Sequence, residues 1–319
     1  SFDREIQKEE KNFLGSAVTT KTAYNALGQI TSISEPYFSS PQIFNNYTYD
    51  TYGRIITETT PLGNITNSYA STTSGTILTI TDKTKGDSFT STRTYDLSGK
   101  LKTIADSGGE TITYTYGPSG NPSQIECGSA IYKMEYDILG KQTKLTDPNA
   151  GAINYTYNAW GNLYTKVDAR NQSETYTYHT DGKLNTYKRG DETFTYQYYS
   201  DPDKPKDMIK MISNASGMKT EYIYDLYGRN TKVSETIETN KSFIFEYQYN
   251  NKNQIERITY PGSKVVKYEY SYGDLKKIIW DHSNTVVWEK LSDNAKGQLV
   301  STRAGNGIQT NYQYIATGI

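Results

Sequence analysis

The sequence predicts an all-β protein made of tandem β-hairpins, and three observations support this prediction. A five-residue frame of the form Tyr-x-x-x-Gly recurs along the whole chain, mostly at intervals of 20 to 25 residues. Many of these frames follow a pair of tyrosines spaced two residues apart, and residues with that spacing in a strand lie on one face of a sheet. A short polar turn ends at each glycine, so every repeat supplies a strand, a turn and a second strand.

The repeat is most regular from Tyr155 to Gly182, where the frames Tyr157–Gly161 and Tyr178–Gly182 stand 21 residues apart. The other full copies are Tyr24–Gly28, Tyr49–Gly53, Tyr95–Gly99, Tyr116–Gly120, Tyr136–Gly140, Tyr224–Gly228 and Tyr314–Gly318. Degenerate copies lie at Tyr69–Gly75, Tyr249–Asn253, Tyr270–Gly273 and Asp293–Gly297. A fixed period of this kind is typical of repeat architectures, and it predicts about fourteen units and roughly 28 strands.

The turns of these repeats have a defined chemistry. In the best copies Asp opens and Gly closes a four-residue turn, because Asp caps its own backbone and Gly accepts a positive φ at the following bulge. The residues predicted to build these structural turns are Asp50, Gly53, Asp96, Gly99, Asp137, Gly140, Gly161, Gly182, Asp225 and Gly228.

No linker or change in composition interrupts the period, so residues 20–319 are predicted to form one domain. Residues 1–19 are predicted to be a charged N-terminal arm or a degenerate first repeat. The segment Phe2–Asn12 shows no strand alternation, and a short helix and a loose arm are equally expected there. Residues 199–208 are expected to form an exposed loop, and residues 69–75 a longer turn.

Roughly 28 strands at a spacing of about 4.8 Å give a sheet with a contour on the order of 130 Å. Open twisted sheets rarely exceed about ten strands without curling or splitting. The low aliphatic content argues against a solid sandwich. The sequence therefore predicts a long, curled, single-layer antiparallel sheet that forms a segment of a hollow spiral shell or barrel.

Composition excludes several classes of protein. The formal net charge of −1 leaves no basic stripe for nucleic acid, and 31 tyrosines supply the apolar surface that a disordered chain lacks. The single cysteine, Cys127, excludes an internal disulfide framework. The sequence contains neither an apolar run long enough for a membrane helix nor a secretory signal of its own. No metal or cofactor site is predicted.

The two histidines do not indicate catalysis. His179 stands where other repeats have Asp or Asn at the start of a turn, and His282 lies in a turn-like cluster. No nucleophile elbow of the Gly-x-Ser-x-Gly kind accompanies them. We therefore expect a protein that is not an enzyme.

The segments YDTYGRI (residues 49–55), YDLSGKL (95–101) and YDLYGR (224–229) resemble the YD-repeat, or RHS-repeat, family, and the resemblance covers nearly all of residues 20–319. It implies a β-sheet spiral that forms a shell, as in bacterial RHS polymorphic toxins, the shells of insecticidal toxin complexes and teneurin-like barrels. The segment DPNAG (147–151) lacks the Leu of the family's Asp-Pro-x-Gly-Leu core and is interpreted as an ordinary hairpin turn.

Two functional hypotheses follow. The first is a non-enzymatic shell segment of a large secreted, cell-surface or cell-wall-associated bacterial protein, which encapsulates or presents a C-terminal toxin that is absent from this chain. The second is an adhesion module that binds carbohydrate or protein through a concave face rich in Tyr and Trp. The expected partners are the toxin domain, the remaining repeats of the parent chain, a glycan or cell-surface protein, and a second copy paired edge to edge through the uncharged strand Asn311–Tyr314.

Overall fold

The computed structural model describes residues 4–41, 43–85, 89–200, 205–238 and 241–314. These residues contain 28 β-strands and one short 3-10 segment, Lys83–Lys85, so the predicted all-β class is confirmed. The strands are β1 (Gln7–Lys11), β2 (Ala17–Tyr24), β3 (Ile30–Ser34), β4 (Phe44–Tyr49), β5 (Ile55–Thr60), β6 (Gly63–Thr72), β7 (Gly75–Asp82), β8 (Thr90–Tyr95), β9 (Leu101–Asp106), β10 (Thr111–Tyr116), β11 (Pro122–Cys127), β12 (Ala130–Tyr136), β13 (Gln142–Asp147), β14 (Gly151–Tyr157), β15 (Leu163–Val167), β16 (Ser173–Tyr178), β17 (Leu184–Arg189), β18 (Glu192–Tyr198), β19 (Ile209–Asn214), β20 (Lys219–Tyr224), β21 (Asn230–Glu238), β22 (Lys241–Tyr249), β23 (Ile255–Tyr260), β24 (Lys264–Ser271), β25 (Asp274–Trp280), β26 (Thr285–Asp293), β27 (Leu299–Ala304) and β28 (Gln309–Asn311).

The described ladders join each strand to the next strand in the chain, always antiparallel. They run from β1 to β11, from β12 to β24 and from β26 to β28. The tandem-hairpin architecture predicted from the repeat is therefore confirmed.

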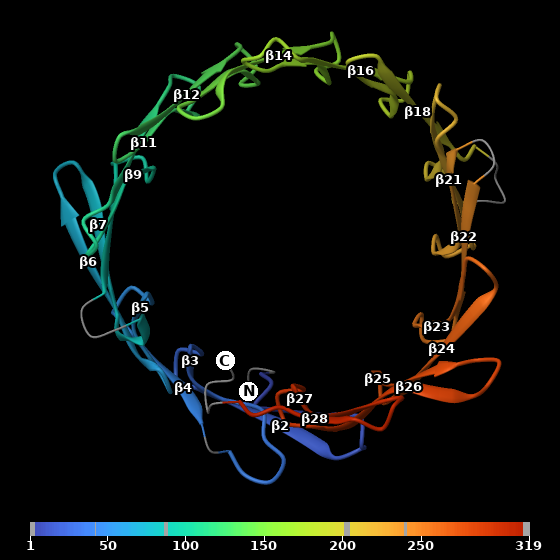
Figure 1. Cartoon of the computed structure of the whole chain (residues 1–319). Helices are drawn as coiled ribbons and strands as arrows, with labels where there is room; N and C mark the ends of the chain where they lie inside the picture. Colours follow the sequence, from blue (N-terminus) through green and yellow to red (C-terminus); the bar gives the residue numbers. More distant parts are fainter. Residues whose placement is uncertain (1–3, 42, 86–88, 201–204, 239–240, 315–319) are drawn as a thin grey trace. The chain divides into compact units, whose positions relative to one another are not determined.

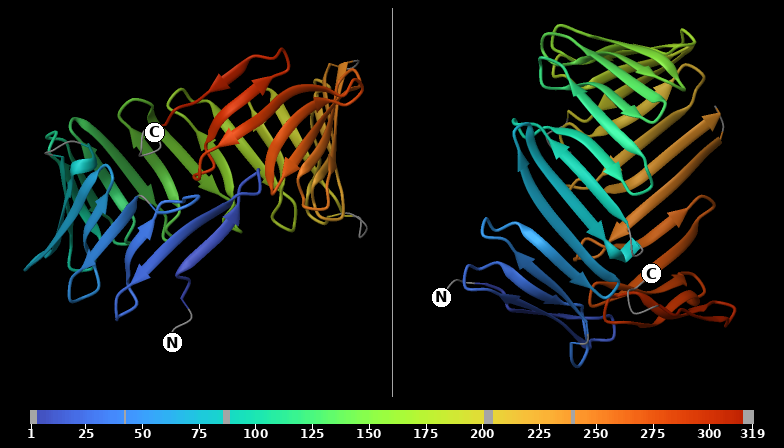
Figure 2. Two further views of the ribbon diagram at one scale, coloured as in Figure 1. Left: turned by 90° about the horizontal axis from the view of Figure 1, so that it is seen from below. Right: turned by 90° about the vertical axis from the view of Figure 1, so that its left-hand side faces the viewer.

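The chain comprises two compact units. Unit 1 consists of residues 1–131, 270–276 and 288–319, and unit 2 of residues 132–269 and 277–287. Unit 1 thus combines β1 to β11 with β27 and β28, which lie near the other end of the sequence. Within unit 2, β13 to β23 follow one another along a single curved layer (Figures 1 and 2).

The two faces of this layer differ in composition. In unit 2, Tyr176 lies opposite Tyr187, which in turn lies opposite Phe194, so aromatic side chains line one face. On the other face, Thr175 lies opposite Lys188. We call the first of these the aromatic face and the second the polar face.

This architecture has almost no hydrophobic core. The buried hydrophobic side chains of the described residues are Phe13, Met134, Tyr224, Val266 and Ile279. Both faces of a single layer are in contact with water, and a side chain with an apolar body and a polar tip suits such half-buried positions. The abundance of tyrosine therefore reflects the absence of a second layer.

The sequence-based expectation of a short helix or loose arm at the N-terminus is wrong for Gln7–Lys11, which forms β1 and pairs with β2. Every side chain of β1 is exposed, and Lys8 forms an ion pair with Glu10 at 2.6 Å. Because neither face of this strand is buried, no hydrophobic period marks it in the sequence. Residues 1–3 lie outside the described part of the chain.

Three further expectations can be compared with the structure. The longer turn at residues 69–75 is wrong, because β6 and β7 extend into this region and Thr72 pairs directly with Gly75. Residues 199–208 do connect two strands, with the Tyr199 amide donating to the Met208 carbonyl at 2.9 Å; residues 201–204 are outside the described range. The strand predicted at Asn311–Tyr314 ends at Asn311, and most of the frame Tyr314–Gly318 is likewise outside the described range.

Candidate functional site

The repeat turns are the most regular feature of the molecule. In the turn Asp50–Gly53, the Gly53 amide donates to the Asp50 carbonyl at 3.0 Å, and the Asp50 amide donates to the Arg54 carbonyl at 2.9 Å. The Asp50 carboxylate accepts the amides of Tyr52 and Arg54, each at 2.9 Å. The ladder then shifts by one residue between Thr48 and Tyr49, which is a β-bulge.

The predicted turn glycines share the conformation that such a turn requires. Their φ angles lie between 78° and 85° at Gly53, Gly99, Gly140, Gly161, Gly182 and Gly228. The predicted aspartates hold the turns in the same way as Asp50, with Asp96, Asp137 and Asp225 each accepting two backbone amides. The Ser98 hydroxyl, together with the amides of Lys100 and Ser98, lowers the pKa of Asp96 below its usual value. These carboxylates are structural acceptors in their turns.

His179 occupies a turn of the same backbone geometry, because its amide donates to the Lys183 carbonyl at 2.8 Å and its carbonyl accepts the Gly182 amide at 2.9 Å. Its ring and that of Tyr198 form a T-shaped pair, with their centres 6.0 Å apart. His282 is exposed at the turn after β25. The two histidines thus lie at different turns, as their sequence context indicated.

A second contact, which the sequence analysis missed, fastens six of the repeats to the previous one. The hydroxyl of Tyr157 donates to the carbonyl of Gln142 at 2.8 Å, and that of Tyr178 donates to the carbonyl of Leu163 at 2.8 Å. In each case the acceptor is the second residue after the glycine of the preceding turn. The same bond joins Tyr49 to Ile30, Tyr116 to Leu101, Tyr198 to Leu184 and Tyr249 to Asn230, at 2.7 to 3.0 Å.

The cation that follows the turn glycine completes this contact. Lys141 Nζ lies 5.4 Å from the centre of the Tyr157 ring, and the Arg229 guanidinium lies 4.4 Å from that of Tyr249. Such a cation attracts the face of the ring. The Gly-Arg/Lys step of the motif therefore positions a cation over the tyrosine of the next repeat. Burial raises the pKa of the Tyr157 and Tyr249 hydroxyls, which remain neutral donors at neutral pH.

The aromatic face of unit 2 carries a cluster of polar and aromatic groups around Tyr176. The Tyr176 ring lies 5.3 Å from that of Tyr187. The Tyr176 hydroxyl donates to Glu174 Oε2 at 2.8 Å, and Lys166 Nζ lies 3.3 Å from the same oxygen. Burial, followed by the hydrogen bond to Glu174, raises the pKa of Tyr176. A hollow of about 550 Å³ beside this cluster is also lined by Arg189.

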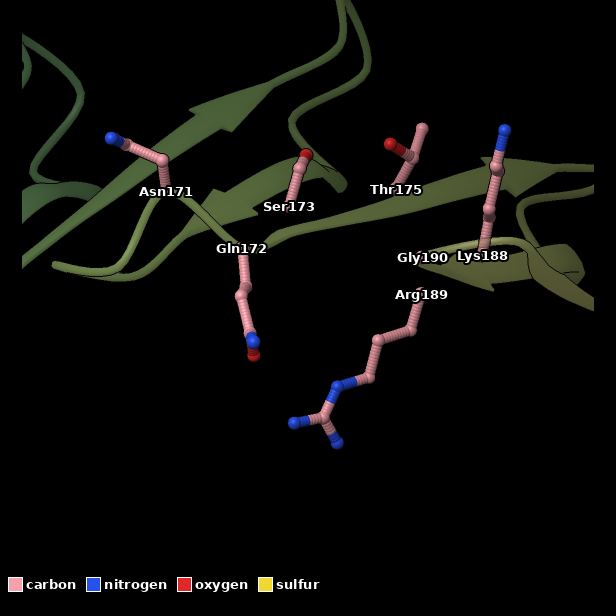
Figure 3. Close-up of a pocket in the computed structure, with 7 residues that line it drawn as sticks. All are labelled: Asn171, Gln172, Ser173, Thr175, Lys188, Arg189 and Gly190. Carbon is pink, nitrogen blue, oxygen red and sulfur yellow. The ribbon is translucent and has the colours of Figure 1, made fainter.

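A neighbouring hollow of about 720 Å³ is lined by residues of both faces (Figure 3). Gln172 and Arg189 point to one side of the sheet, whereas Ser173, Thr175 and Lys188 point to the other. This hollow therefore surrounds the edge of the sheet at two hairpin turns.

Within the described ranges, no group of three or more His, Cys, Asp or Glu side chains could hold a metal ion. The same residues contain no helix long and apolar enough to cross a membrane. Cys127 is a free thiol and only partly buried.

Comparison with solved structures identifies the fold. A crystal structure of TcdB2-TccC3 matches 97% of this chain and 19% of its own chain, with a TM-score of 0.78 and 15% identity. TcdB2-TccC3 without its hypervariable C-terminal region matches 97% and 19%, with a TM-score of 0.79 and 15% identity. A Tc holotoxin pore of Photorhabdus luminescens with a TccC3 mutation matches 94% and 18%, with a TM-score of 0.76 and 15% identity.

This chain has the fold of a TcdB2-TccC3 segment. The resemblance to the YD-repeat shells of toxin complexes, drawn from the turn motifs, is thus confirmed for the fold. The chain spans about a fifth of the length of these structures. No protein-family model matches the sequence, and no curated protein matches it.

The YD-repeat fold also distinguishes the two edges of the sheet. Turns that join an even-numbered strand to the next odd-numbered strand all lie at one edge, which we call the YD edge. Several of these turns carry large apolar side chains that are each at least 75% exposed: Leu27, Tyr52 and Leu97 in unit 1, and Ile138, Leu139, Trp160, Leu226 and Tyr227 in unit 2. Two turns at the opposite edge of unit 2 are polar, DPNAG (147–151) and DARNQ (168–172).

Proposed function

We propose that this chain is a non-enzymatic wall segment of a secreted, shell-forming toxin protein. The observation that carries the proposal is the fold match over 97% of the chain to proteins of a toxin complex. A single layer of hydrogen-bonded hairpins is a wall: it separates two compartments without needing a core of its own. In this proposal, residues 20–319 act as one continuous repeat array, and an enclosed toxin domain is the partner.

The physical design of the repeats supports a containing role. On the aromatic face, tyrosine hydroxyls such as those of Tyr157 and Tyr178 already donate their hydrogen bond to a backbone carbonyl of the previous repeat. That face therefore presents apolar ring surface with few free donors, which is suited to contact with a partly unfolded polypeptide without specific recognition.

Protease protection of the full-length parent protein tests this proposal. The segment that follows the repeat array should survive a concentration of protease that degrades the same segment when it is expressed alone. Equal rates of cleavage in the two samples would contradict containment. A fragment of the parent that contains only the repeats serves as the control for cleavage of the wall itself.

A glycan-binding role is the second candidate, and the cluster around Tyr176 favours it. The Tyr176 and Tyr187 rings provide stacking surface. Nearby, Lys166, Glu174 and Arg189 line a hollow of about 550 Å³ and provide hydrogen-bonding groups for a sugar. Calorimetric titration with neutral and acidic oligosaccharides should give binding that Tyr187→Ala abolishes. Thr186→Ala, on the opposite face, should leave the binding unchanged, and no binding by the wild-type chain would rule this role out.

A further inference from the structure

The N-terminal hairpin makes a specific contact with a strand near the other end of the sequence, and both lie within unit 1. Asn12 follows β1, and its side-chain amide donates to Asp293 Oδ1 at 3.0 Å across 281 residues of sequence. Asn12 is 8% exposed, and the Asp293 side chain is completely buried. In a protein with almost no core, two buried polar side chains that meet in this way require an explanation.

Residues 12–15 form a repeat turn that the sequence frame does not reveal. The Gly15 amide donates to the Asn12 carbonyl at 2.9 Å, the Asn12 amide donates to the Ser16 carbonyl at 3.0 Å, and Gly15 has a φ of 84°. Asn12 Oδ1 accepts the amides of Leu14 and Ser16, as Asp50 does in its own turn. Asn12 thus takes the place of the repeat aspartate, while Lys11 stands where the frame has Tyr.

The side chain of Asn12 does what an aspartate cannot do at this position. Its oxygen caps the turn, and its NH₂ group remains free to donate to a distant carboxylate. An aspartate would retain the cap but would bring a second carboxylate close to that of Asp293.

One of the two central side chains of this turn, that of Phe13, is buried. Phe13 is 3% exposed, whereas the adjacent Leu14 is 60% exposed and Leu27, in the turn after β2, is 83% exposed. Phe13 lies under Lys290, whose Nζ is 4.5 Å from the ring centre. Lys290 also pairs with Asp293 at 2.8 Å and with Asp274 at 3.1 Å.

Two further contacts join the same parts of unit 1. Lys296 Nζ lies 2.9 Å from Glu35 Oε2, and each of these side chains is about a quarter exposed. A Cβ atom at Gly15 would lie 3.0 Å from the ring of Tyr272, so the turn packs directly against that ring.

We propose that the turn Asn12–Gly15 is a latch that fastens the first hairpin, β1–β2, to the hairpin β26–β27. Consecutive hairpins of a repeat array contact only their neighbours, so their stabilities are coupled locally. The latch adds contacts of very long sequence separation, of Asn12 with Asp293 and of Phe13 with Lys290. These contacts involve few residues, so the two hairpins separate first at the latch. Release of Asn12 from Asp293 is the step that separates the hairpin β1–β2 from the hairpin β26–β27.

Hydrogen exchange of backbone amides in three variants of the whole chain tests the latch. Asn12→Asp retains both turn-capping bonds but removes the donor to Asp293. Asn25→Asp is the matched control, because Asn25 caps its turn in the same way through the amides of Leu27 and Gln29, and its NH₂ group reaches only Gln29. Asn12→Asp combined with Asp293→Asn places the donor on the other side of the same bond.

We expect Asn12→Asp to accelerate exchange in β1 and β2 by about 10- to 100-fold, the range for loss of a hydrogen bond to a charged group. Exchange in β14 and β15 of unit 2 should be unchanged. Asn25→Asp, the control, should change the exchange rates of β1 and β2 by less than about threefold. The double variant, Asn12→Asp with Asp293→Asn, should restore at least part of the protection from exchange. Equal effects of Asn12→Asp and Asn25→Asp, or a double variant no better protected than Asn12→Asp, would overturn the proposal.

Discussion

Substitution of a single turn glycine measures how strongly the repeat depends on its left-handed residue. Gly182 is the best site, because its φ is +85° and no atom lies within 4 Å of the position that a Cβ would occupy. A side chain added there meets no neighbour, so its cost is that of the backbone conformation alone. For an L-residue with a Cβ this cost is about 1 to 2 kcal/mol, with alanine near the lower value and a β-branched residue near the upper.

The chain contains its own control for this experiment. Asn253 occupies the corresponding position of another repeat turn with a φ of 64°, so asparagine is compatible with this geometry. Gly182→Asn should therefore cost only a few tenths of a kcal/mol, because asparagine tolerates this region. Gly182→Ala should cost about 1 kcal/mol and Gly182→Val about 2 kcal/mol.

Amide exchange in β16 and β17, the strands that this turn joins, is the appropriate assay, because it reports the local hairpin. A cost of 1 to 2 kcal/mol corresponds to faster exchange by a factor of roughly 5 to 30. The reasoning would be refuted if the amides of β16 and β17 exchanged as slowly in Gly182→Val as in the wild type. It would also be refuted if Gly182→Asn accelerated their exchange as much as Gly182→Val. Gly75→Ala gives the contrasting case: its φ is also positive, and its Cβ would collide with the Tyr95 carbonyl, so it should be more damaging than Gly182→Ala.

The other predictions concern the contacts between repeats. Tyr157→Phe removes the hydroxyl that bonds to Gln142 and should lower the free energy of unfolding by about 0.5 to 1.5 kcal/mol in urea, whereas Tyr164→Phe, at an exposed tyrosine, should have no effect. Arg229→Gln should lower it by about 0.5 to 1 kcal/mol, and salt should weaken the part that comes from the ion pair with Asp225. Because folding raises the pKa of tyrosines such as Tyr157 and Tyr249, stability should be constant below the ordinary tyrosine pKa of about 10 and should fall as the pH rises above it. Circular dichroism and phenolate absorbance would check this fall, and a protein equally stable on both sides of that pH would contradict it.

Local chemistry made most of the fold predictable from the sequence. Asp50 and Gly53 define a turn by their own hydrogen bonds and dihedral angles, and Tyr-x-Tyr pairs assign one face of each strand, so these features recur wherever the residues recur. The contact of Tyr157 with Gln142 was equally periodic, since Tyr116 and Tyr178 each bond to the residue fifteen positions earlier in the chain. The separation is 14 residues for Tyr198 and 19 for Tyr49 and Tyr249, so the shared feature is the acceptor's place two residues after a turn glycine. Only the paired strands show that a hydroxyl meets a carbonyl there.

Other features were decided by the tertiary structure alone. The strand Gln7–Lys11 has no hydrophobic alternation in the sequence because both of its faces are in contact with water. Only its pairing with β2 identifies it as a strand. Phe13 and Asp293 look like ordinary turn residues in a chain where such residues are normally exposed. Their burial comes from the contact of two segments of unit 1 that are far apart in the sequence, and a local pattern does not specify such a contact. A local pattern specifies each hairpin, whereas the contact between Asn12 and Asp293 joins residues 281 positions apart in the sequence and is seen only in the tertiary structure.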